Sequence, residues 1–365
     1  MAQANKAPSY PFACCLNPEQ EMALPMRPMG KQGMVTSMQG YGCMGLTSFY
    51  GKPVSLDAAH EVLQKAYDLG IRHFDSAEMY VGKDENDNPV FNEAYLGSWV
   101  AKVGRDKVTV ATKYFPAEGK SDCTKEQVRE SLEKSLANLG TDYVDLYYLH
   151  RIPSDDSLKS FMEAAKELVA EGKIKYLGVS EATPDNIRAA HAIHPLTAVQ
   201  QEWSLLIRNL EADVVPTCRE LGIAIVAYSP LCRGFASATV KTIDDWSKIG
   251  NDGGARNGFQ TMCPTLGENV EANAKLLEPL EKKAGELGVS AATLSLAWLQ
   301  SMGEDVFPIP GTTKVANLES NVGAAKLCTE LAKEKLSTLG EEVDWKALQG
   351  DRYPTMFMGM CYEKK

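Results

Sequence analysis

Short apolar runs alternate with amphipathic stretches along the chain from residue 37 to residue 325. The apolar runs are rich in Val, Ile and Tyr, whereas the stretches between them repeat apolar positions at helical spacing, which favours strand–helix units around a parallel sheet. The predicted strands cover residues 37–42, 71–74, 107–112, 143–149, 174–179, 197–201, 223–228 and 306–309. The predicted helices cover residues 56–69, 92–103, 124–139, 158–170, 183–193, 212–221, 291–302 and 315–325.

Eight such units in roughly 290 residues favour a closed (β/α)8 TIM barrel over an open doubly wound sheet. The segment 231–289 is too long for one crossover, and we expect a long loop over the barrel mouth followed by an extra helix near residues 269–287. The predicted organisation has three parts, which are an N-terminal extension over 1–30 with a small hairpin near 26–36, a barrel over 31–330, and a C-terminal helix and tail over 331–365.

Composition narrows the class of protein. The formal net charge is −10, which disfavours nucleic-acid binding because phosphate contacts need a basic surface. No apolar run reaches the roughly 18 residues of a membrane helix, and the N-terminal residues show no signal-peptide pattern. Nine irregularly spaced cysteines without a C-x-x-C pair predict reduced thiols, a cytoplasmic location and no zinc site.

Polar side chains stand where several predicted strands end. Asp75 ends the second strand and Tyr80 follows five residues later, while Lys113 and His150 end the third and fourth strands. Each residue alone has an ordinary explanation, as a helix cap, a packing residue, a solvated lysine or a structural histidine. In a barrel, however, all four belong to the C-terminal face, where active sites assemble, so we expect them to converge in one pocket.

This quartet suits carbonyl reduction. A phenol has a pKa near 10 and is a weak acid at neutral pH. The Lys113 ammonium is expected to lower the pKa of Tyr80, and Asp75 to keep Lys113 charged and oriented. His150 is expected either to hydrogen-bond the same carbonyl oxygen or to help move the proton. Tyr80 then becomes the general acid that protonates a carbonyl as a hydride reaches its carbon.

Seven segments together carry a resemblance to a known family. They are G-I-R-H-F-D-S-A-E-M-Y (70–80), V-A-T-K (110–113), Y-V-D-L-Y-Y-L-H-R (143–151), G-V-S (178–180), Q-x-E-W-S (200–204), A-Y-S-P-L-x-R-G (227–234) and P-I-P-G-T-T-K (308–314). In this order they make the chain similar to the aldo-keto reductase family over most of residues 30–330. The resemblance is nearest to NADPH-dependent reductases that carry P-G-T-T-K, a group that includes pyridoxal reductase-like enzymes.

The resemblance implies an NADP-dependent oxidoreductase that reduces small aldehydes or ketones, with a catalytic tetrad formed by Asp75, Tyr80, Lys113 and His150. It implies contacts to the nicotinamide from Ser180, Gln200 and Tyr228, and to the pyrophosphate from Ser229, Leu231 and Arg233. The adenosine 2′-phosphate end would meet Gly311, Thr312, Thr313, Lys314, Asn317 and Asn321. A lysine beside the amides of a helix N-terminus is in itself a phosphate site, which favours NADPH. The expected substrate walls are the C-terminal tail together with Met44, Phe49, Tyr50 and Trp203.

Some positions depart from the family pattern or admit another explanation. Glu181 stands where the family usually has Asn, and Cys232 replaces a common Gly, as a small buried side chain or a redox-sensitive thiol. The acidic loop 81–91 is longer than usual and either shapes the pocket mouth or is a solvated turn. Residues 40–45 match G-x-G-x-x-G, but the next helix begins ten residues later, so a Rossmann site is disfavoured.

Two alternatives to a carbonyl reductase remain open. One is a Schiff-base lyase that uses Lys113 as nucleophile, and the other is a non-catalytic NADPH-binding redox sensor with residues 1–30 as a candidate partner segment. No partner other than a small-molecule carbonyl substrate is predicted, and the chain is expected to be a monomer or a weak homo-oligomer. The sequence does not identify the substrate.

Overall fold

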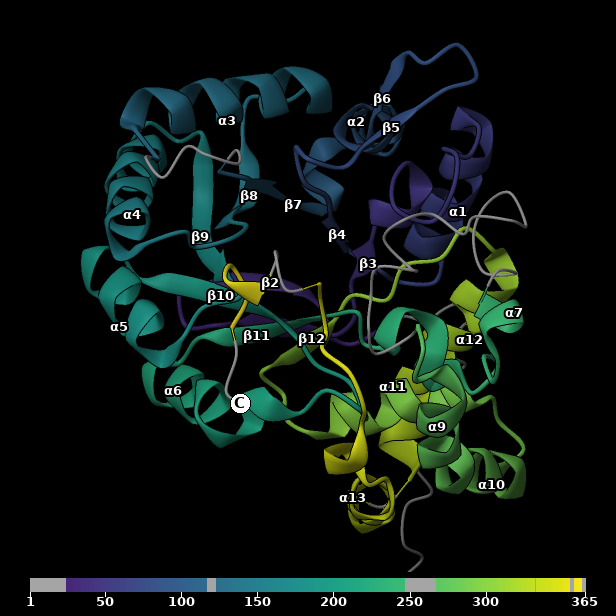
Figure 1. The fold of residues 1–365 in the computed structure, drawn as a ribbon. Helices are drawn as coiled ribbons and strands as arrows, with labels where there is room; N and C mark the ends of the chain where they lie inside the picture. Colours follow the sequence, from purple (N-terminus) through teal and green to yellow (C-terminus); the bar gives the residue numbers. More distant parts are fainter. Residues whose placement is uncertain (1–23, 117–122, 247–266, 332, 355–357, 363–365) are drawn as a thin grey trace, which may run out of the picture.

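The computed structural model describes residues 24–116, 123–246, 267–331, 333–354 and 358–362. At its centre lies a parallel sheet of eight strands in the order β12-β11-β10-β9-β8-β7-β4-β3, curled into a barrel (Figure 1). The edge strands meet where Gly40 N–H donates to the Pro308 carbonyl at 2.9 Å and Gly42 N–H donates to the Pro310 carbonyl at 3.4 Å. The predicted (β/α)8 fold is thereby confirmed. The strands are β3 (Tyr41–Gly42), β4 (His73–Asp75), β7 (Thr109–Tyr114), β8 (Val144–Leu149), β9 (Ile174–Ser180), β10 (Leu196–Glu202), β11 (Ala224–Tyr228) and β12 (Val306–Pro308).

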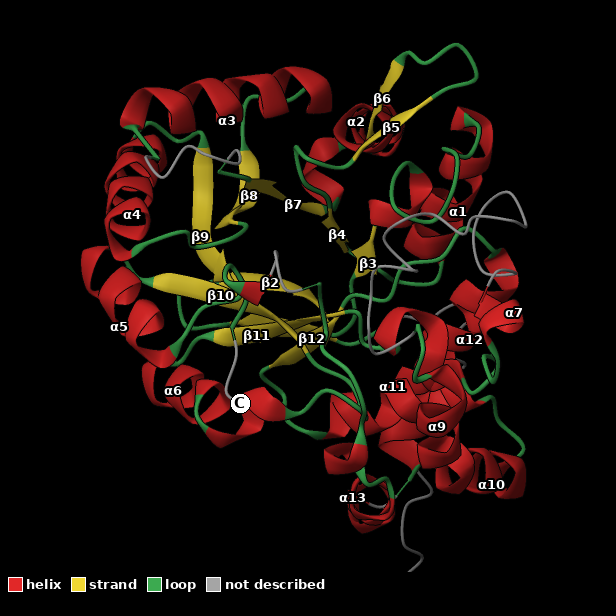
Figure 2. Cartoon of the chain, viewed as in Figure 1, coloured by secondary structure: helices red, strands yellow, loops and turns green. Residues whose placement is uncertain are grey.

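Helices surround the strands (Figure 2). The barrel helices are α1 (Leu56–Asp68), α2 (Asn92–Val103), α3 (Lys125–Leu139), α4 (Asp155–Ala170), α5 (Pro184–Ile193), α6 (Val214–Leu221), α11 (Ala291–Ser301) and α12 (Val315–Glu330). Local sequence explains several of their starts, since Thr124 and Thr183 form capping boxes and Pro184 occupies the first turn of α5.

An N-terminal hairpin closes the bottom of the barrel. Its strands β1 (Met26–Met29) and β2 (Met34–Ser37) pair antiparallel, and the buried side chains of Met29 and Met34 belong to the cluster inside the barrel. The predicted strand 37–42 is therefore corrected. Its first residue ends β2, and the first barrel strand begins only at Tyr41, because residues 34–37 pair with β1 instead of the barrel sheet.

A hairpin and several helices are added to the eight strand–helix units of the barrel. The acidic loop forms a hairpin of β5 (Val81–Lys83) and β6 (Pro89–Phe91), which projects from the barrel in Figure 1. The single helix predicted near 269–287 is instead α9 (Val270–Ala274) and α10 (Glu278–Leu287), joined by a 3-10 turn. The additional helices are α7 (Ile243–Trp246) and α13 (Lys333–Glu342). Residues 1–23 of the predicted extension and 247–266 of the predicted mouth loop lie outside the described residues.

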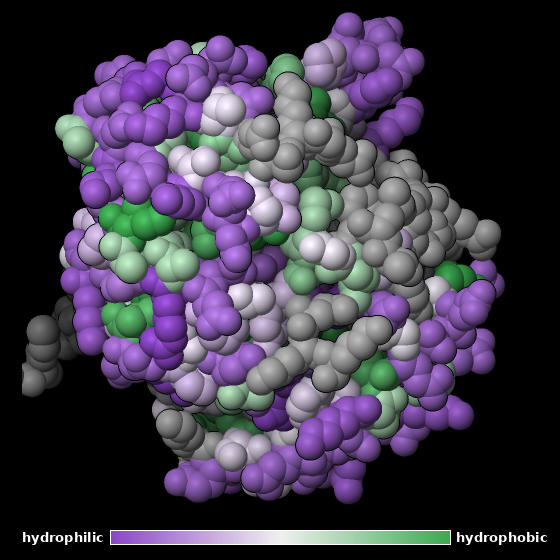
Figure 3. Space-filling model, turned by 60° about the vertical axis from the view of Figure 1, so that its left-hand side comes forward, coloured by the Kyte–Doolittle hydropathy of each residue, from purple (hydrophilic) through white to green (hydrophobic). Residues whose placement is uncertain are grey.

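The surface, the helix lengths and the cysteines of the described residues bear on the class of protein. Figure 3 shows hydrophilic residues over much of one face, with smaller apolar patches between them. Every helix in the described ranges is too short or too polar to traverse a bilayer. The described cysteines, which exclude Cys14, Cys15 and Cys263, form no disulfide, and no metal-binding cluster of His, Cys, Asp or Glu occurs in these ranges.

Candidate active site

A cavity of about 730 Å³ opens at the carboxyl ends of the barrel strands. One end contains Tyr80 and His150, and the other reaches the start of α12 at Lys314. The strands end in polar side chains here, and the loops after β3, β4, β7, β8, β11 and β12 contribute to the wall. Position and size both suit an elongated small-molecule ligand.

A buried ion pair supports the floor of this cavity. The Lys113 ammonium contacts the Asp75 carboxylate and donates to the Ser76 carbonyl at 2.7 Å. The other Asp75 oxygen accepts from the Gln200 amide at 2.8 Å. Lys113 is wholly buried and does not line the cavity, whereas its partner Asp75 does. Lys113 can therefore act on a ligand only through its charge or through Tyr80.

Tyr80 lies directly above this pair. Lys113 Nζ is 5.1 Å from the centroid of the Tyr80 ring, and the His150 ring meets Tyr80 edge-to-face at 5.8 Å between centroids. The Tyr80 carbonyl accepts hydrogen bonds from the backbone N–H of Asn92 at 3.0 Å and from the Thr47 hydroxyl at 3.2 Å, and these bonds fix the backbone of Tyr80. The structure thus brings Asp75, Tyr80, Lys113 and His150 together at one end of the cavity.

The electrostatics at Tyr80 differ from the expectation. Burial raises the pKa of the Tyr80 phenol, the Asp75 carboxylate raises it further, and the main opposing charge is Arg151. The pKa of Tyr80 is thus raised, which is opposite to the predicted lowering, and the charge of Lys113 is paired with Asp75. Burial also lowers the pKa of His150, helped by Arg151 and Lys113. At neutral pH Tyr80 therefore keeps its proton and the imidazole is neutral.

The residues expected at the cofactor are distributed along the cavity wall. The lining includes Gln200, Tyr228, Ser229, Leu231, Arg233, Gly311, Thr312, Thr313, Lys314, Asn317 and Asn321. Ser180 is the exception, because its side chain is buried beneath the wall, where its hydroxyl has no protein partner among the described residues. Ser229, Cys232 and Arg233 have φ values of 44°, 48° and 57°, so the loop after β11 holds a strained left-handed backbone, as functional loops often do.

Glycine is required where the two edge strands meet. A Cβ on Gly311 would lie 2.5 Å from the Gly42 carbonyl oxygen, and a Cβ on Gly42 would lie 2.8 Å from the Ile309 carbonyl oxygen. These backbones approach more closely than any side chain allows. Gly40 and Gly42 of the 40–45 motif thus serve barrel closure beside the cavity, and α1 begins only at Leu56, as expected for a chain without a Rossmann site there.

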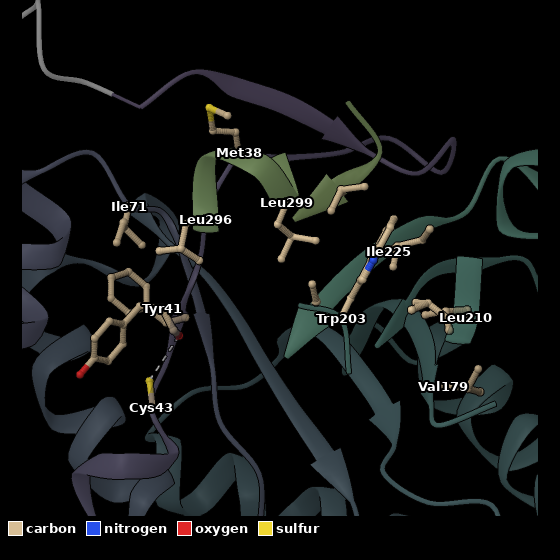
Figure 4. Packing of buried hydrophobic residues seen from close by; sticks show 14 of the residues in the cluster. Met38, Tyr41, Cys43, Ile71, Val179, Trp203, Leu210, Ile225, Leu296 and Leu299 are labelled. Carbon is tan, nitrogen blue, oxygen red and sulfur yellow. Dashed lines mark hydrogen bonds between the residues drawn. The ribbon is translucent and has the colours of Figure 1, made fainter. Parts of the chain in front are cut away.

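The expected substrate walls are placed in part. Met44, Phe49 and Tyr50 line the cavity, whereas Trp203 does not. Trp203 is fully buried outside the barrel, its indole N–H donates to Glu211 at 3.0 Å, and Figure 4 shows it among the packed apolar side chains near Ile225. The C-terminal tail, which was expected to form part of this wall, contributes Tyr353, Met360 and Cys361, and the residues that sequence reasoning missed are Met79, Phe115 and Arg151. The hairpin over 81–91 contributes no lining residue.

The Glu181 departure has a structural consequence. Arg352, from the C-terminal tail, donates to Glu181 at 2.7 Å and to Glu202 at 3.1 Å, and we call these three residues the C-terminal clasp. Glu181 also accepts from the Tyr362 amide at 2.9 Å and the Tyr228 hydroxyl at 2.8 Å. Glu181 does not line the cavity, so its carboxylate holds the tail.

The clasp places the tail across the barrel mouth. In Figure 1 the yellow C-terminal segment crosses the opening in front of β10. The Tyr353 hydroxyl lies 3.0 Å from that of Tyr228, and the Arg233 guanidinium lies 4.8 Å from the Tyr353 ring centroid and 3.2 Å from Glu202. The tail therefore touches the same β11 loop that is expected to hold the cofactor. Cys232 is fully buried beneath this loop.

Comparisons with known proteins agree with this geometry. Residues 40–342 match the Aldo/keto reductase family. The chain is 40% identical over 333 residues to the "Probable aldo-keto reductase 1" of Glycine max, covering 89% of this chain and 90% of the soybean protein. It also resembles a crystal structure of the thermostable aldo-keto reductase Tm1743 in complex with the inhibitor epalrestat, with a TM-score of 0.68, 24% identity, and coverage of 87% of this chain and 100% of that one. That last likeness bears on the fold alone.

A (β/α)8 barrel with an acid, a phenol, an amine and an imidazole gathered at its carboxyl end is a framework for oxidoreductase chemistry on small carbonyl compounds. The chain belongs to the aldo/keto reductase family. The expected pyridoxal reductase-like subgroup stays a prediction.

Proposed function

We propose that this protein reduces aldehydes or ketones to alcohols with NADPH and that Tyr80 is the general acid. The observation that carries this proposal is the convergence of Tyr80 and His150 on one cavity wall, directly above the buried Lys113–Asp75 pair. A nicotinamide-dependent oxidoreductase that acts on small carbonyl compounds is what membership of the family implies.

The cavity residues fit an NADPH molecule. The Ser180 hydroxyl, buried beneath the wall, has no hydrogen-bond partner among the described residues and so suits a carboxamide. At the other end α12 is a 16-residue helix whose first amides have no side-chain cap, and Lys314 precedes it with an exposed side chain. Free amides and an ammonium together suit a phosphate group, which supports NADPH over NADH. Because Gly42 and Gly311 have no side chains, neither position fills this side of the cavity.

The bound cofactor would supply a hydride to the carbonyl carbon. This chain's own residues do the rest. Tyr80 donates its proton to the carbonyl oxygen, and the neutral His150 ring, with Nδ1 unpartnered among the described residues, can donate a second hydrogen bond to the same oxygen. As the phenol loses its proton, the Lys113 ammonium stabilises the phenolate, and Asp75 keeps Lys113 oriented. Solvent then returns a proton to Tyr80.

The observations favour neither alternative. A Schiff-base lyase needs an exposed, neutral amine, but Lys113 is wholly buried and paired with Asp75. A non-catalytic sensor would not require the tetrad that the cavity brings together. A cytoplasmic location and the monomeric or weakly oligomeric state stay predictions.

The test is NADPH oxidation in the presence of an aldehyde panel, comparing the native chain with Tyr80→Phe. We expect a loss of about 10²–10⁴-fold in kcat, because one general acid contributes on that order. NADPH affinity should stay within about twofold, since the phenol hydroxyl is not needed for binding. Tyr95→Phe is the matched control, because the Tyr95 hydroxyl donates to the Val54 carbonyl away from the cavity. Full turnover by Tyr80→Phe would reject the proposed acid.

A further inference from the structure

Arg151 is a cavity residue that the tetrad does not use. It follows His150 at the end of β8 and lines the wall beside Tyr80 and Phe115. Its guanidinium donates to the His150 carbonyl at 2.7 Å and lies 5.9 Å from the Tyr353 ring centroid. A guanidinium carries five N–H donors. No carboxylate in the described part of the chain forms an ion pair with it, and Arg151 is one of the residues that line the cavity.

The neighbouring charges leave Arg151 as the unmatched cation. Lys113 is paired with Asp75, and Arg352 is paired with Glu181. Glu202 is shared between Arg233 and Arg352. Among the described residues at this end of the cavity, four cations therefore meet three carboxylates, and each carboxylate already has a closer partner than Arg151. The Glu181 carboxylate attracts Arg151 but forms its ion pair with Arg352, so an incoming anion would give Arg151 a direct partner of its own.

The surroundings of Arg151 suit a particular shape of ligand. The wall around it is aromatic or apolar, with the Phe115 ring 5.5 Å from that of His150 and the Phe49 ring 6.3 Å from that of Tyr80. An aromatic or apolar body would pack there, while the planar guanidinium fork matches a carboxylate. The carbonyl of the same molecule would then lie toward Tyr80 and His150.

We infer that Arg151 is an anion subsite, and that the preferred substrates are carbonyl compounds carrying a carboxylate on an aromatic or apolar body. The inference rests on the proposed reductase function and specifies its substrate class. Arg151 acts here as a specificity-determining residue that touches the substrate away from the reacting carbonyl.

The test compares two substrates of nearly equal shape, para-carboxybenzaldehyde and methyl para-formylbenzoate. In the native chain kcat/KM should favour the acid. Arg151→Met should lower the acid-to-ester ratio of kcat/KM by about 10–100-fold, the range expected for a hydrogen-bonded charge pair. Arg151→Lys should retain most of the ratio. Arg188→Met is the matched control and should leave the ratio unchanged, because Arg188 pairs with Glu220 on the outer helices. The ratio removes any effect of Arg151 on Tyr80 that both substrates share.

A binding measurement separates this inference from the proposed function. Benzoate, which cannot be reduced, is titrated into the native chain and into Arg151→Met by calorimetry. A loss of affinity of at least about tenfold in the variant supports the anion subsite even if neither aldehyde is turned over. The inference is overturned if the native chain binds no benzoate, if Arg151→Met leaves the substrate ratio unchanged, or if the variant instead loses NADPH affinity, which would assign Arg151 to the cofactor.

Discussion

Breaking the C-terminal clasp should uncouple the tail from the barrel. The perturbation is Arg352→Met, which keeps an apolar stem of similar length and removes the guanidinium. The lost contacts are those to Glu181 at 2.7 Å, to Glu202 at 3.1 Å and to the Tyr362 carbonyl at 2.6 Å. Both carboxylates are buried, so each would lose a charged partner without gaining water.

The pKa of Glu181 gives the size of the expected loss in the free energy of unfolding. Burial alone would raise the pKa of this carboxyl, but Arg352, with help from Arg151 and Tyr228, lowers it from 4.5 to about 2. At about 1.4 kcal/mol per pKa unit, this difference corresponds to about 3 kcal/mol. Because the folded-state pKa lies below the unfolded one, this stabilisation is present above pH 4.5 and is lost as the pH falls toward 2. Arg352→Met should therefore cost about 3 kcal/mol at neutral pH and about half of that at about pH 3.

The assay is urea unfolding of both chains at the two pH values, with limited proteolysis to detect a released tail. Released Tyr353, Met360 and Cys361 would also open the cavity wall, so KM for an aldehyde should rise more than kcat falls. A double-mutant cycle with Glu181→Gln isolates the pair, since Arg352→Met should cost less once the carboxylate is gone. An equal loss at both pH values, or no loss at neutral pH, would refute this account of the clasp.

Two further substitutions test the cofactor end of the cavity. Lys314→Ala should raise the Kd for NADPH by more than about tenfold and change that for NADH little, because only NADPH offers a 2′-phosphate to the ammonium; equal losses in fluorescence titrations of the two cofactors would contradict it. Gly311→Ala should destabilise the fold by about 1–3 kcal/mol and weaken NADPH binding, because its Cβ would lie 2.5 Å from the Gly42 carbonyl oxygen. Gly323→Ala on α12, where a Cβ meets nothing closer than 3.9 Å, is the control for thermal unfolding, and a variant at Gly311 as stable as this one would contradict the steric argument.

Periodicity predicted the barrel well because buried parallel strands and amphipathic helices differ strongly in pattern. The helix at Asn92–Val103 has the predicted bounds, and most strands differ by one to three residues at an end. The strand predicted over 37–42 was wrong. The end of the hairpin strand and the start of the barrel strand follow each other closely in the sequence, and only their different pairing partners show that they are two strands. The β5–β6 hairpin was missed because its strands have three residues each and its turn is held by Asp84 side-chain hydrogen bonds.

Strand ends predicted the tetrad because a barrel brings all its strand ends to one face, whatever their separation in the chain. No local signal predicted the clasp, since Glu181 and Arg352 are 171 residues apart and the tail carries no period. Trp203 shows the converse limit. Trp203 comes directly after β10, as a pocket residue would, but its indole N–H donates to Glu211 outside the barrel. The sequence pattern at a strand end does not indicate the direction of a single side chain.

The electrostatics at Tyr80 explain why a raised resting pKa is compatible with acid catalysis. At rest Lys113 is paired with Asp75, and burial together with the Asp75 carboxylate keeps the proton on the phenol. When the proton moves to a substrate oxygen, negative charge appears on the phenol, whose ring centroid lies 5.1 Å from the ammonium. That attraction acts in a buried site and is gained only as the proton transfers, which is the condition under which an interaction raises kcat. In the proposed mechanism Lys113 would therefore lower the barrier for proton transfer by stabilising the negative charge that forms on the phenol.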